Sequence, residues 1–105
     1  MDGYKIITER FTITNTMGLD LRCVRMLVQT ALEFQVEVEV SYRNELADGK
    51  SLLEVLALGI PSGAVVDVSF YGHEAQQAHE AIQFLFNHAF ASEPLPEVRR
   101  DAVAI

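Results

Sequence analysis

The stretch that decides the fold is Val-Glu-Val-Glu-Val-Ser-Tyr-Arg-Asn-Glu-Leu-Ala, residues 36–47. Its three valines alternate with polar residues, and this period of two predicts a half-buried β-strand. Arg43-Asn44 is a plausible turn, because asparagine tolerates a positive φ. Residues 45–47 are then expected to pair back as a short edge strand. Two strands joined by so short a connection form a hairpin, so the sheet is expected to be antiparallel.

Working outward, a helix is predicted on each side of this hairpin. Asp20 precedes apolar residues spaced by three and four, and aspartate is a preferred N-cap because its carboxylate accepts the free amides of a first turn. On the other side, Ser51 begins a short apolar helix over residues 52–58, and Gly59 is a suitable stop. The apolar stripe of the first helix consists of Val24, Leu27, Val28, Ala31 and Leu32.

The outer segments complete the order β-α-β-β-α-β-α. Alternation predicts strands over residues 7–13 and 65–70, and a long helix follows Gly72. Each helix has a single apolar stripe, so we expect an α+β fold in which helices cover one face of an antiparallel sheet. The stripe of the last helix consists of Ala75, Ala78, Ile82, Leu85, Phe86 and Ala89.

The chain is expected to divide into a domain, residues 1–91, and a C-terminal tail, residues 92–105. Ser92, Pro94 and Pro96 break any helix at the junction. Glu97 and Arg99-Arg100 could fold back toward the loop around Asp20, and disorder, which is common at chain ends, is the alternative.

Composition excludes several classes of function. The net charge of −7 argues against nonspecific nucleic-acid binding and against binding to an anionic membrane. No membrane-spanning run or signal segment is visible, so a cytoplasmic protein is expected. Cys23 is the one cysteine, which rules out an internal disulfide and a cysteine-rich zinc site, and no metal or cofactor is expected.

Two stretches resemble the HPr family, the histidine phosphocarriers of the sugar phosphotransferase system. Gly18-Leu19-Asp20-Leu21-Arg22 resembles the family's Gly-Leu-His-x-Arg-Pro active-centre loop, and residues 50–59 resemble its regulatory serine segment. The resemblance runs over roughly residues 6–90. It implies an open-faced β-sandwich, with a four-stranded antiparallel sheet and three helices on one face. It also implies a phosphoryl group received from Enzyme I on a histidine at a helix start, where amides, the helix dipole and an arginine stabilise it.

In this resemblance Asp20 takes the position of the family histidine, Cys23 replaces the proline, and Arg22 is kept. A carboxylate can form an acyl phosphate. However, Asp20 as an N-cap would itself occupy the amides that a phosphate needs, so capping without phosphoryl transfer is favoured. Arg22 is interpreted either as what remains of an anion site or as an ordinary solvated arginine. His73, His79 and His88 are alternative acceptors. The last two are expected to be solvated, although His88 or Phe90 could approach Asp20.

Ser51 is the candidate for regulatory phosphorylation, and an ordinary N-cap serine is the alternative. The resemblance also implies a face that contacts partner proteins, with partial burial in the core as the alternative. Its residues are Met17, Leu21, Leu52, Leu53 and Leu56.

Three functions follow as hypotheses. The favoured one is an HPr-like module that binds a phosphotransferase protein, such as Enzyme I or a regulatory protein, without carrying phosphate on histidine. The second is an active phosphocarrier that uses Asp20 or a helix histidine, and the third is a divergent binding scaffold unrelated to sugar transport. The oligomeric state stays open.

Overall fold

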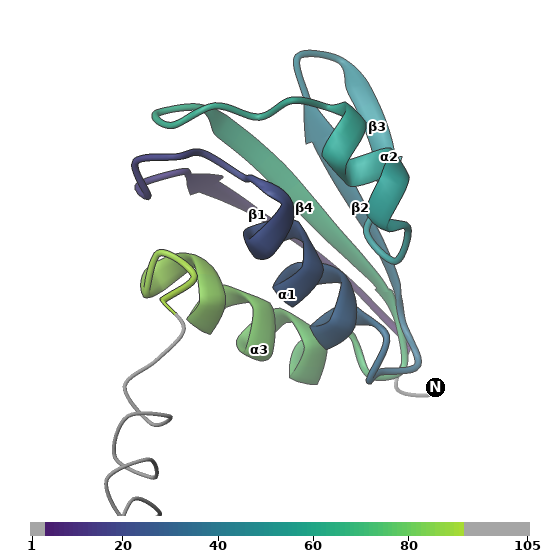
Figure 1. The fold of residues 1–105 in the computed structure, drawn as a ribbon. Helices are drawn as coiled ribbons and strands as arrows, with labels where there is room; N and C mark the ends of the chain where they lie inside the picture. The colour runs from purple at the N-terminus through teal and green to yellow at the C-terminus, as the bar shows by residue number, and fades with distance from the viewer. Residues whose placement is uncertain (1–3, 92–105) are drawn as a thin grey trace, which may run out of the picture.

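Four antiparallel strands form one sheet in the order β1-β4-β2-β3 in a computed structural model that describes residues 4–91. Three helices lie together on one face of this sheet and leave the other face open, as Figure 1 shows. The element order and the open-faced arrangement confirm the fold expected from the sequence. The elements are β1 Lys5–Thr12, α1 Leu21–Ala31, β2 Glu37–Tyr42, β3 Glu45–Asp48, α2 Leu52–Ala57, β4 Val65–Gly72 and α3 Ala75–Asn87.

The predicted hairpin forms between β2 and β3. Arg43 and Asn44 both have positive φ angles, 51° and 66°, as a two-residue type I′ turn requires. In the resulting register Val40 lies opposite Ala47, and both side chains are buried under the helices. Leu46 is 63% exposed, because it pairs with Ser41 on the open face.

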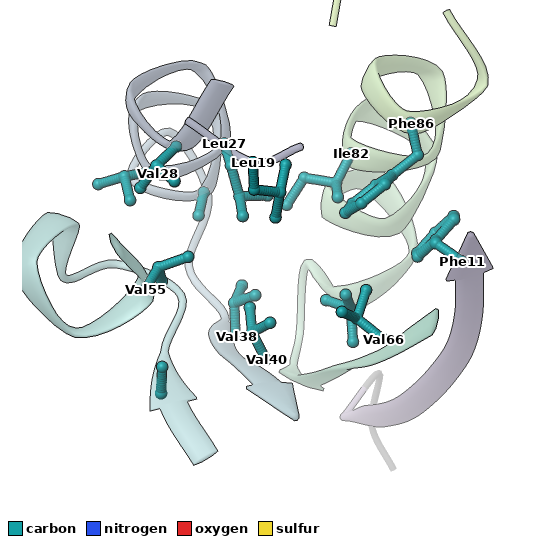
Figure 2. Packing of buried hydrophobic residues seen from close by; sticks show 14 of the residues in the cluster. Phe11, Leu19, Leu27, Val28, Val38, Val40, Val55, Val66, Ile82 and Phe86 are labelled. Atoms are coloured by element: carbon teal, nitrogen blue, oxygen red, sulfur yellow. The ribbon is translucent and has the colours of Figure 1, made fainter. Parts of the chain in front are cut away.

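The hydrophobic core lies between the helices and the covered face of the sheet. In Figure 2, Leu27 of α1 and Ile82 and Phe86 of α3 point down toward valines of the central strands. Phe11 of β1 closes one end of this layer, with its ring stacked on Phe86 at a centroid distance of 4.1 Å. The alternation of apolar and polar residues therefore predicts correctly which side of each strand is buried.

Two helix ends differ from the prediction. Leu32 was expected to be inward-facing and is 60% exposed, because α1 ends at Ala31 and Leu32 is only its C-cap. The last helix ends at Asn87, and Ala89 and Phe90 then adopt left-handed φ angles of 52° and 56°. This reversal turns the Phe90 side chain into the core, where it is 1% exposed.

Candidate functional site

The site predicted around residues 18–22 is a capped helix start. Asp20 has an extended backbone, and its carboxylate Oδ1 accepts a hydrogen bond from the amide of Cys23 at 3.1 Å. This bond is the main reason that the pKa of Asp20 lies below its usual value, and Arg22 contributes less. The predicted N-cap is confirmed, so the carboxylate already occupies a donor of the first turn.

The loop before Asp20 is held tightly against the α2–β4 connection. The Leu19 amide donates to the Ile60 carbonyl at 2.9 Å. Gly18 has a φ of 71°, and a Cβ there would lie 2.7 Å from the Ile60 oxygen, so only glycine fits without a shift. The side-chain amide of Asn15 donates to the Gly18 carbonyl and to the Cys23 sulfur. Hydrogen bonds on both sides therefore fix the path of this loop.

The guanidinium of Arg22 contacts other parts of the fold. Its Nη1 donates to the Phe90 carbonyl at 2.6 Å and also contacts the sulfur of Met26 at 3.4 Å. The guanidinium thus connects the start of α1 to the turn after α3. Phe90 therefore contacts the site through its main-chain oxygen, which accepts from Arg22. The imidazole of His88 instead contacts its own helix. A side-chain pattern in the sequence cannot reveal a contact made by a main-chain oxygen.

Cys23 is fully buried beside Asp20. Burial raises the pKa of the Cys23 thiol, and the neighbouring Asp20 raises it further. A thiol in such surroundings stays protonated at neutral pH and fills space, as expected for a lone buried cysteine.

The three histidines take separate positions. His73 packs edge-on against Tyr4 near the start of α3. The Nδ1 of His88 lies 2.8 Å from the Phe84 carbonyl of its own helix. His79 was expected to be solvated, and that prediction is wrong: its side chain is 19% exposed, and its Nε2 is hydrogen-bonded to the Glu9 carboxylate of β1.

Ser51 and Asp20 lie toward opposite ends of α2. The Ser51 hydroxyl oxygen accepts the Glu54 amide at 3.3 Å, which makes it the N-cap of α2. Its neighbour Lys50 donates to the Phe34 carbonyl, just beyond the last turn of α1. Ile60, which follows α2, contacts the Asp20 loop instead. Ser51 is thus associated with the far end of α1.

The expected partner face is partly exposed. Met17 is 75%, Leu21 49% and Leu53 76% exposed, whereas Leu52 and Leu56 pack against the core with part of their surface. α1 and α2 are in direct contact, so these side chains belong to neighbouring elements. In residues 4–91 no group of histidine, cysteine or carboxylate side chains gathers as metal ligands. No helix of that part is long and apolar enough to cross a bilayer.

Comparisons with known proteins agree with this geometry. A family model described as the PTS HPr component phosphorylation site matches residues 7–88. The phosphocarrier protein HPr of Xylella fastidiosa strain Temecula1 is 31% identical over 85 residues, which cover 81% of this chain and 96% of that protein. The multiphosphoryl transfer protein of Salmonella typhimurium is 34% identical over 80 residues, which cover 73% of this chain but 21% of that larger protein.

Solved structures of similar proteins have the same fold. The structure of HPr-C-His from Thermoanaerobacter tengcongensis has a TM-score of 0.75 at 31% identity, covering 86% of this chain and 99% of that one. A histidine-containing phosphocarrier protein of Mycoplasma has a TM-score of 0.75 at 25% identity and is covered completely, along with 83% of this chain.

Proposed function

The chain belongs to the HPr family of the phosphotransferase system, and from its site geometry we propose that it binds proteins of that system without carrying phosphate on a histidine. In this proposal Asp20 stands at the position of the family histidine. Enzyme I or a regulatory protein is the partner, and the cytoplasm is the location. The function is then recognition rather than phosphoryl relay.

One observation carries this proposal: the hydrogen bond from the Cys23 amide to the Asp20 carboxylate. A phosphoryl group at a helix start needs the free amides of the first turn, and the carboxylate uses one of them already. The low pKa of Asp20 keeps a negative charge there, which opposes a second anion. Attack on a phosphoryl donor by Oδ1, the oxygen that accepts the Cys23 amide, would also break the cap.

The state of Arg22 supports the same conclusion. A guanidinium that stabilises a bound phosphate must present its donors to it. Here the Nη1 of Arg22 is directed to the Phe90 carbonyl. While this contact holds, Nη1 is not available to a phosphoryl group at the helix start.

The proposed docking face consists of Met17, Leu21 and Leu53, with Leu52 and Leu56 beneath it. Large apolar side chains exposed to this degree on neighbouring elements are typical of a protein-binding surface. Leu53, at 76% exposure, contributes little to the core, so its replacement tests binding separately from folding.

Calorimetric titration with Enzyme I tests this face. We expect Leu53→Asp to weaken binding by about tenfold or more, since a central apolar contact is worth roughly 1–2 kcal/mol. Leu46→Asp is the matched control, because Leu46 is a similarly exposed leucine, at 63%, on the opposite face of the sheet. Equal affinities for the two variants would contradict the assignment of this face.

We also propose Ser51 as a site of regulatory phosphorylation. Its hydroxyl is the N-cap of α2, where the amides of the first turn tolerate negative charge, and Leu52 and Leu53 follow it directly. A serine kinase of the system should therefore label the native chain but not Ser51→Ala. Ser62→Ala, at an exposed turn, should retain full labelling, and label that survives in Ser51→Ala would refute this site.

A further inference from the structure

The outer side of α1 carries a shallow hollow that is separate from the Asp20 carboxylate. It has a volume of about 380 Å³ and is lined by Leu21, Arg22, Arg25, Met26 and Gln29. Two cations and no acid contribute to this lining. Within residues 4–91 Arg10 forms an ion pair with Asp67, whereas neither arginine of the hollow forms an ion pair with a carboxylate of that range.

The described chain ends beside this hollow. Phe90 is 1% exposed, and its carbonyl accepts the hydrogen bond from Arg22 at 2.6 Å. Arg22 therefore both lines the hollow and holds the last buried residue of the domain. Ser92, the first residue of the tail, is only two residues beyond Phe90 in the sequence.

We propose that residues 92–98, Ser-Glu-Pro-Leu-Pro-Glu-Val, bind in this hollow. The segment carries two carboxylates, Glu93 and Glu97, which complement the two arginines, and it ends before the cations Arg99 and Arg100. Leu95 lies between the two carboxylates in sequence, and in this proposal its side chain contacts the exposed part of Leu21.

The reach of the chain suits this pairing. Glu93 is three residues beyond Phe90, which an extended chain spans in about 10 Å. Arg25 is one turn from Arg22, roughly 5 Å along the helix axis. A proline disfavours the helical conformation of the residue before it, so Pro94 and Pro96 favour an extended segment. Less conformational entropy is then lost when the segment binds.

This binding is weak and reversible. Exposed ion pairs are screened by water and salt, but the tether holds the segment near the hollow at an effective concentration on the order of millimolar. Because Leu21 belongs to the proposed docking face, a bound tail would compete with the partner protein. That consequence rests on the proposed function, whereas the binding of the tail to α1 does not.

Nuclear magnetic resonance relaxation of the full-length chain tests the proposal in low salt and without any partner. We expect order parameters of the Leu95 and Val98 amides above about 0.6, the level below which backbone is flexible. We also expect contacts between the methyl groups of Leu95 and Met26. Arg25→Gln should lower the order parameters below that level, and added salt should do the same.

Arg43→Gln is the control, since Arg43 is an exposed arginine in the distant β2–β3 turn, and it should leave the order parameters unchanged. Order parameters below about 0.6 in the native chain would overturn the proposal. So would equal values in the native chain and Arg25→Gln. Either result would leave the binding of Enzyme I to Leu53 untouched, so failure of this inference is distinguishable from failure of the proposed function.

Discussion

Replacement of Arg22 by methionine should destabilise the domain even though Arg22 is an exposed residue. The substitution keeps an unbranched side chain that can pack along α1 but removes the donor to the Phe90 carbonyl. It releases the turn in which Ala89 and Phe90 hold left-handed φ angles. Such conformations are costly for residues other than glycine and persist only where neighbours hold them.

The size of the effect follows from this contact. A hydrogen bond to a charged group contributes about 1.5–3 kcal/mol when it is shielded from water. The Arg22 side chain is exposed, so solvent competes and we expect a loss of about 1 kcal/mol in the free energy of unfolding. For a domain of this size, that loss lowers the melting temperature by about 4–8 °C.

Thermal and urea unfolding of Arg22→Met beside Arg25→Met provide the assay. Arg25 is an exposed residue one turn further along α1, and the screened contacts proposed for it with the tail are weak, so its replacement should change stability by less than about 0.5 kcal/mol. If Arg22→Met were no less stable than Arg25→Met, the Phe90 contact would not hold the end of α3, and the role given to Arg22 would be wrong.

Three further predictions concern the loop and the core. The pKa of Asp20 is lowered in the folded state, so the ionised carboxylate stabilises the fold above the unfolded pKa of about 3.9, and this stabilisation is lost as the pH falls through the folded pKa. The difference in melting temperature between the native chain and Asp20→Asn should therefore shrink in acid. A difference that stays constant with pH would contradict this prediction. Gly18→Ala should cost about 1–3 kcal/mol in urea unfolding, because of its positive φ and the clash with Ile60; a neutral result would mean that the loop shifts freely. Phe86→Ala should cost about 3–5 kcal/mol by the same assay, because the ring is 5% exposed and stacked on Phe11, and a loss below that of Gly18→Ala would place Phe86 outside the core.

The sequence was sufficient for the features that depend on neighbours along the chain. Alternation in residues 36–41 located a strand and its buried side, and Arg43-Asn44 located the turn. Asp20 and Ser51 were recognised as caps, because a cap forms with amides only three residues away.

Features that depend on distant parts of the chain were not accessible in this way. The position of His79 off the apolar stripe of its own helix predicts a solvated side chain, but its partner Glu9 lies 70 residues away on β1. The contact between Arg22 and Phe90 spans 68 residues and uses a main-chain oxygen, which every residue possesses. No side-chain pattern can identify such an acceptor.

The most direct test compares the native chain and Asp20→His side by side, by intact mass after incubation with Enzyme I and phosphoenolpyruvate. If this site docks with Enzyme I and lacks only its acceptor, the native chain keeps its mass and Asp20→His gains one phosphoryl group. A phosphoryl group on the native chain would show that it is a carrier, which would contradict recognition without relay. An unmodified Asp20→His would contradict a site that docks with Enzyme I and lacks only its acceptor.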